Sequence, residues 1–170
     1  MSISMYEFSI PALTRGLTNM SAFLDKAAAY AETKKFDTVV LAQARLFPDM
    51  HPLLRQVQIA CDTAKGAGAR LAQLEIPKHP DTETTFAELK ARITKTLDFL
   101  KTITPAQVQG AEARAIEIKF PNGSWKFTGV SYLTEFVLPN FYFHLSMVYA
   151  LLRNNGVDVG KGDFLGAIQK

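Results

Sequence analysis

The chain has 170 residues, of which 48% are hydrophobic and 21% charged, so we expect residues 1–170 to form a single globular domain. Its 19 basic and 16 acidic residues leave a net charge of only +3, and Lys34-Lys35 is the densest basic pair. Nucleic-acid surfaces usually carry a basic stripe, so this distribution predicts no nucleic-acid partner.

The cysteine content and the hydrophobic runs indicate where the protein works. Cys61 is the single cysteine, which excludes an intrachain disulfide and fits a reducing compartment. No apolar run approaches the length of a bilayer-spanning helix, and the first residues lack the pattern of a secretory signal. We therefore expect a cytoplasmic protein that does not bind a membrane.

Three long helices are predicted before residue 104. Apolar residues recur every three or four positions over about residues 11–33, 52–74 and 86–103, which places them on one buried stripe of each helix. Pro11 and Pro52 suit first turns, where the missing N–H of proline costs nothing. Thr85 and Glu88 have the spacing of a capping box at the start of the third helix.

A different pattern follows, in "AIEIKFPNGSWKFTG" at residues 115–129. Apolar residues alternate with polar ones on both sides of Asn122-Gly123, the strongest short-range indication of a β-hairpin. An isolated two-stranded hairpin is marginally stable, so we expect its apolar face to lie on the helices. Thr104-Pro105 should begin a short helical turn before it.

A fourth long helix is expected over about residues 131–154, with a kink or restart at Pro139 and a stop at Asn155-Gly156. The tail should be anchored by Phe164 and Leu165. Four helices with a small hairpin inserted before the last one predict an all-α helix bundle.

His144 is the most informative residue, because it stands in the apolar stretch "FYFHLSMVYALLRNNGV" at residues 141–157. At about 100° per residue, Leu133, Val148 and Leu151 fall around it, so His144 points into the bundle. Asn140 lies one turn earlier on the same side. Buried imidazole and amide groups need hydrogen-bond partners. They either satisfy each other, a tyrosine or a backbone carbonyl, or they line an interior polar pocket.

In the pocket hypothesis, the lining residues are Asn140, His144, Gln58 and Tyr132. His51 either caps the second helix or points into the mouth of the bundle, and His79 should lie in solvent in the loop before the third helix. Cys61 lies on the buried stripe without a basic neighbour in sequence, so we expect an inert thiol. No catalytic residue is identified.

Three segments carry a resemblance to a known family: "FPDMHPLLRQVQIACDTAKGAGARL", "TTFAELKARITKTLDFL" and "LPNFYFHLSMVYALLRNNGVDVGKGDFLG". Together they resemble the DinB/YfiT-like superfamily of helix bundles, and more closely a branch of unknown function. The resemblance covers nearly the whole chain and implies a four-helix bundle of the up-down-down-up type.

The resemblance also implies a cofactor. Members of the superfamily often bind a divalent metal such as Zn or Ni through three histidines, and some are thiol-dependent transferases. One histidine comes from the second helix and two from an H-x-x-x-H pair on the last. His144 matches the second of that pair, Asn140 stands at the first position, and His51 is the histidine nearest the second-helix position. An amide oxygen is a poor ligand for these metals, so His144 and His51 would remain as ligands of a degenerate site.

Three functional hypotheses follow. The first is a bundle with a degenerate metal site and a pocket around His144 that binds a small molecule or nothing. The second is a divalent-metal-dependent (thiol) transferase or hydrolase, in which water, Asp62 or Glu135 completes the ligands. The third is a non-enzymatic homodimer that uses the alanine-rich face of the first helix and the Gly/Ala stretch of the second.

Overall fold

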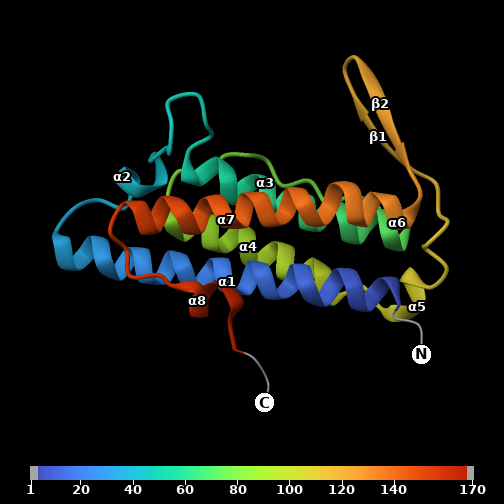
Figure 1. Ribbon diagram of the computed structural model, residues 1–170, viewed down its shortest axis with the longest axis horizontal. Coiled ribbons are helices and arrows are strands. Elements are labelled where there is room, and N and C mark those ends of the chain that lie inside the picture. The colour runs from blue at the N-terminus through green and yellow to red at the C-terminus, as the bar shows by residue number, and fades with distance from the viewer. Residues whose placement is uncertain (1–3, 168–170) are drawn as a thin grey trace.

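A computed structural model describes residues 4–167, and Figure 1 shows its four long helices lying side by side. They are α1 (Met5–Lys34), α3 (Leu53–Ala72), α4 (Phe86–Lys101) and α7 (Leu138–Asn154). Helices α1 and α3 each pack against the other three. The predicted helical fold with a small hairpin is confirmed. Within the described residues, no helix combines the length and the hydropathy that crossing a membrane requires.

Helix α1 begins six residues earlier than predicted, because Ser4 and Glu7 form a capping box that the sequence prediction missed. The prediction that Pro11 lies in the first turn is therefore wrong, since Pro11 lies inside the helix. Its exposed position explains why it is tolerated: the carbonyl left without an N–H partner, that of Glu7, is also at the surface. The predicted stripe from Ile10 to Ala31 is buried.

Helix α3 begins at Leu53, so Pro52 is its N-cap residue and lies outside the first turn. Its small residues are buried inside the chain. A Cβ atom on Gly68 would lie 2.5 Å from Cδ1 of Ile103 and 2.9 Å from Cδ2 of Leu100, so any larger residue here would force these two side chains to move. The Gly/Ala stretch is thus not available as a surface between two copies, and the homodimer stays a prediction without this support.

The segment between α3 and α4 returns along the bundle to the end where α3 began. Asp81 and Glu83 in this segment contact Arg55 and Gln58, which lie in the first two turns of α3. Helix α4 therefore starts at the same end as α3. The predicted capping box of Thr85 and Glu88 is confirmed, and its hydrogen bonds lower the pKa of Glu88 to about 2.

Strands β1 (Ile116–Phe120) and β2 (Gly123–Phe127) form an antiparallel hairpin, with Phe120 opposite Gly123. Figure 1 shows the hairpin standing away from the bundle. Most of its apolar face packs as predicted: Ile116 is buried, Ile118 and Phe127 are partly buried against the core, and the ring centroid of Trp125 lies 5.8 Å from that of Phe136 in the last long helix. The expectation is confirmed only in part, because Phe120 near the turn is 40% exposed and packs on Trp125, with centroids 5.2 Å apart.

Three short helices pack on the outside of the bundle. Helix α2 (Val39–Ala42) buries Leu41, α5 (Pro105–Val108) is the predicted turn, and α8 (Lys161–Leu165) stacks Phe164 on Phe23. The second predicted anchor, Leu165, is instead exposed, because α8 turns only one side toward α1.

The last long helix is continuous through α6 (Gly129–Ser131), the π-helical segment η1 (Tyr132–Val137) and α7. The irregularity predicted at Pro139 lies just before it, and Pro139 itself occupies the first turn of α7. A π-helical turn contains an extra residue and so changes the direction of the side chains before it, which a regular helical repeat cannot predict. This turn places Tyr132 and Phe136 against α3 and the hairpin.

Candidate functional site

His144 is buried between α7 and α3, and its partner is Gln56. The Nδ1 atom of His144 lies 2.6 Å from Oε1 of Gln56. The amide nitrogen of Gln56 donates to the carbonyl of His51, which fixes the amide orientation. Oε1 can only accept, so Nδ1 of His144 must carry the proton.

This environment keeps His144 neutral. Burial, with a smaller effect of the charges of His51 and Arg55, lowers the pKa of His144 from 6.5 to about 4. Its Nε2 atom has no hydrogen-bond partner among residues 4–167, and it is not among the polar atoms that are sealed from solvent. At neutral pH the outer edge of the ring is therefore a free hydrogen-bond acceptor.

Asn140 does not contact His144, so the two side chains do not satisfy each other. Instead, Nδ2 of Asn140 donates to Oγ1 of Thr63 at 2.7 Å. Asn140 thus faces α3 one turn away from the imidazole, and its oxygen has no partner within the described part of the chain.

Asn140 lies in a groove between α3 and η1, with a volume of about 250 Å³. The apolar lining of this α3–η1 groove consists of Ile59, Ile118, Tyr132 and Phe136. Its polar groups come from Arg55, Asp62, Thr63, Arg70 and Asn140. Apolar walls with a few convergent polar groups are typical of small-molecule sites.

Arg70 lies at one end of the groove and is held by Tyr132. Nη1 of Arg70 donates to the hydroxyl of Tyr132 at 3.1 Å, and the guanidinium lies 5.8 Å from the ring centroid. Burial raises the pKa of Tyr132, and Arg70 opposes that effect. Within residues 4–167, Arg70 forms no ion pair with an acid.

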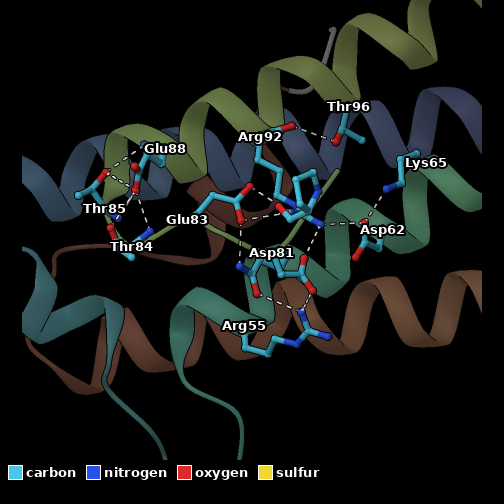
Figure 2. Close-up of polar contacts among 12 residues, drawn as sticks. Arg55, Asp62, Lys65, Asp81, Glu83, Thr84, Thr85, Glu88, Arg92 and Thr96 are labelled. Atoms are coloured by element: carbon cyan, nitrogen blue, oxygen red, sulfur yellow. Dashed lines mark hydrogen bonds and ion pairs between the residues drawn. The ribbon is translucent and has the colours of Figure 1, made fainter. Parts of the chain in front are cut away.

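A second arginine, Arg92, is the centre of the ion-pair network in Figure 2. Its guanidinium lies 2.8 Å from Asp62, 2.9 Å from Asp81 and 3.0 Å from Glu83. Its side chain is only 1% exposed. The network joins α3, α4 and the loop between them, so it fixes that loop to both helices.

The periphery of this network satisfies the remaining acidic groups. Arg55 pairs with Asp81, Lys65 pairs with Asp62 at 2.8 Å, and Nε2 of Gln58 donates to Glu83 at 2.9 Å. Partial burial alone would raise the pKa values of Asp81 and Glu83, but hydrogen bonds and the charge of Arg92 lower both.

His79 is not in solvent, contrary to the sequence prediction. It lies half-buried in the segment before α4, and its Nδ1 atom is sealed without a hydrogen-bond partner among the described residues. Burial, followed by the charges of Lys65 and Arg92, lowers its pKa, so the ring is neutral. The extended segment at residues 76–80 folds over α3 and places the ring there.

The donor set does not fit the three-histidine centre that the resemblance implies. Within residues 4–167, no three side chains of His, Cys, Asp or Glu are grouped closely enough to hold a metal ion. His51 is exposed, Asn140 is bonded to Thr63, and Asp62 belongs to the Arg92 network. Glu135 is exposed as well, and burial raises the pKa of Cys61 to about 12, as expected for an inert thiol.

The structure brings together only part of the predicted pocket. Asn140 and Tyr132 line the α3–η1 groove, His144 lies one turn from it against Gln56, and Gln58 belongs to the Arg92 network. Arg70, Gln56 and Arg92 were not predicted from the sequence as site residues. Arg92 could have been noticed, because it follows Leu89 by three residues and precedes Thr96 by four, beside a buried stripe.

Comparisons with known proteins agree with this architecture. A family model described as a domain of unknown function, DUF1993, matches residues 5–165. The crystal structure of a DinB family member from Shewanella denitrificans is 46% identical, with a TM-score of 0.89, and the match covers 97% of this chain and 93% of that one. No curated protein matches the chain. The chain therefore belongs to the DinB family and, within it, to the DUF1993 branch of unknown function.

Proposed function

We propose that this protein binds a small organic molecule in the α3–η1 groove, and that it does so without a three-histidine metal centre. The observation that carries the proposal is the combination of an apolar wall with spare polar groups in one groove. Ile59 and Phe136 offer contact surface, while the oxygen of Asn140 and the guanidinium of Arg70 are left to bind a ligand.

The size of the groove limits the ligand. A dry cavity of about 150 Å³ is known to accommodate benzene, so the groove's volume of about 250 Å³ is sufficient for a single aromatic ring with a short polar substituent. Phe136 and Tyr132, which stack at a centroid distance of 5.9 Å, would contact such a ring from the η1 side. The oxygen of Asn140 would accept a hydrogen bond from the substituent.

The π-helical turn supports the proposal in a second way. π-helical turns frequently occur at functional sites. Here the turn directs Tyr132 toward Arg70 and Phe136 toward the base of the hairpin, so a single local irregularity contributes two residues of the groove lining.

A metal-dependent transferase or hydrolase is the second candidate, and one observation favours it. Metal-binding histidines usually donate their second ring N–H to an oxygen, as Nδ1 of His144 does to Gln56. The described donors other than His144 do not complete a site. On this candidate, stoichiometric zinc or nickel would remain after dialysis and be lost in His144→Ala. We expect the dialysed protein to retain none.

The small-molecule proposal is tested with neutral aromatic alcohols such as benzyl alcohol, using NMR chemical shifts to measure affinity. Asn140→Leu should weaken binding about tenfold, because it removes a hydrogen-bond acceptor and narrows the groove. Thr94→Leu on the exposed face of α4 is the matched control and should bind as the parent does. The site would be excluded if the NMR chemical-shift changes lay outside the groove residues, or if Asn140→Leu left the affinity unchanged.

A further inference from the structure

A larger open cavity lies beside the α3–η1 groove, under the segment at residues 76–80. Its volume is about 660 Å³, and its floor is the middle of α3. Asp62 and Arg70 line both spaces, so the groove and this loop cavity meet at these two side chains.

The acidic group in the loop cavity already has its partners. Oδ1 of Asp62 lies 2.8 Å from both Nη2 of Arg92 and Nζ of Lys65. In the network as a whole, three cations (Arg55, Lys65 and Arg92) pair with three acids (Asp62, Asp81 and Glu83). The network is therefore close to neutral and contributes no net negative charge to the cavity.

The basic groups of the cavity, in contrast, have N–H donors that form no hydrogen bond within the described residues. Arg70 has five N–H donors and bonds only to the hydroxyl of Tyr132 among the described residues. Lys65, whose side chain is 7% exposed, uses one of its three N–H donors on Asp62. Lys78 lies on the opposite wall and forms no ion pair within residues 4–167. His79 is neutral, so it adds no charge.

We propose that the loop cavity binds the carboxylate or phosphate group of an aromatic organic anion whose ring occupies the α3–η1 groove. This inference rests on the proposed function and adds the chemical class of the ligand. Arg70 is the residue that joins the two parts: its guanidinium donates two N–H groups to the anion while Tyr132 holds it at the end of the groove. Lys65 and Lys78 supply further donors from the floor and the loop.

The experiment compares three probes by isothermal titration and NMR shifts: benzyl alcohol for the ring alone, inorganic phosphate for the anion alone, and phenyl phosphate for both. Phenylacetate replaces phenyl phosphate in a parallel arm, which distinguishes a preference for phosphate from one for carboxylate. We expect at least one of the two aromatic anions, phenyl phosphate or phenylacetate, to bind about tenfold more tightly than benzyl alcohol. That difference is the effect of one or two charge-assisted hydrogen bonds.

Arg70→Gln should abolish the tenfold ratio between the affinities for the anion and for benzyl alcohol, so the ratio is the readout and not the affinity for benzyl alcohol alone. Lys78→Gln, an exposed change that should not affect folding, should reduce the ratio about threefold. Lys101→Gln is the matched control, because Lys101 is exposed on α4 and pairs with Asp98 away from the cavity.

The outcomes separate the two proposals. The anion site would be overturned if benzyl alcohol, phenyl phosphate and phenylacetate bound with equal affinities and Arg70→Gln changed none of them. The groove would then remain as a site for neutral molecules. If none of the probes binds in the groove, the proposed function itself fails and the inference fails with it. Phosphate alone binding in an Arg70-dependent manner would support the anion site by itself.

Discussion

Two arginines near Asp62 show how similar side chains acquire different roles. Arg92 is almost completely buried and pairs with three carboxylates. Arg70 is half-buried, has no acidic partner among the described residues, and bonds only to a tyrosine hydroxyl. The first arginine joins three segments of the chain, whereas the second borders two open spaces.

The difference lies in how fully each charge is compensated. A buried charge without partners costs several kcal/mol, so Arg92 is compatible with folding only because the loop and α3 supply acids around it. A partly exposed guanidinium can remain unpaired because water solvates it, and water is readily exchanged for a ligand. The three acids around Arg92 indicate a structural arginine, although its buried Nε has no partner among the described residues, whereas the free donors of Arg70 beside a cavity are the basis of the proposed binding role.

Arg92→Met tests the structural half of this comparison and should have the largest effect. The change leaves Asp62, Asp81 and Glu83 without their common partner, although Lys65, Arg55 and Gln58 still contact one acid each. We expect the free energy of unfolding to fall by about 3 kcal/mol, the low end for breaking a buried pair. Urea denaturation followed by circular dichroism measures it.

The matched control is Lys95→Met on the exposed face of the same helix, which should change stability by less than about 0.5 kcal/mol. Equal stabilities of Arg92→Met and the parent would contradict a structural role for the network. In that case the distinction between a compensated and an uncompensated arginine would have no energetic basis.

The helices and the hairpin could be predicted from sequence because they depend on local rules. Apolar residues at helical spacing identified the stripes of α1, α3 and α4, Thr85 and Glu88 identified a cap, and Asn122-Gly123 identified the turn of the hairpin. The failures have local causes too. The Ser4 cap was overlooked, and the π-helical turn at η1 has no simple sequence pattern.

The candidate site could be predicted only in part, because its contacts join distant segments. The partner of His144 is 88 positions earlier, at Gln56, and the partner of Asn140 is 77 positions earlier, at Thr63. Helical periodicity places a side chain on a face but does not say which polar group lies opposite. The same limit applies to Arg70, whose proposed role depends on its having no acidic partner among residues 4–167.

His144 is intermediate between the two arginines in how well its polar groups are paired, since it is buried with a single partner. Its titration should have the next largest effect on the free energy of unfolding. The pKa of His144 in the folded protein, about 4, is below 6.5, so the unfolded chain binds the proton more readily. Its contribution to stability is complete above pH 6.5 and is lost as the pH falls toward 4. We expect a loss of about 2–3 kcal/mol over this range by urea denaturation.

His144→Gln should reduce the slope of the stability curve between pH 6.5 and 4, because it removes one of the two imidazoles whose pKa is lowered by burial; His79 keeps its own contribution. Acids such as Asp81 and Glu83, whose pKa values are lowered, lose their contribution as the pH falls below about 5, so the difference between parent and variant is read between pH 6.5 and 5. His51→Gln is the control, because His51 is exposed. If parent and His144→Gln lose stability equally over this range, the imidazole is not buried in its neutral form.

Arg70→Gln should have the smallest effect on stability, about 1 kcal/mol or less, because only the bond to Tyr132 is at stake and glutamine retains an N–H donor. The size of this effect matters as much as its direction. A loss near that of Arg92→Met in urea denaturation would mean that Arg70 holds the fold together, and its spare donors would then say nothing about binding. A small loss, together with unchanged circular dichroism, would mean that the fold does not require a charge at this position. The free N–H groups of Arg70 would then remain available to a ligand at the junction of the two cavities, as the binding proposal requires.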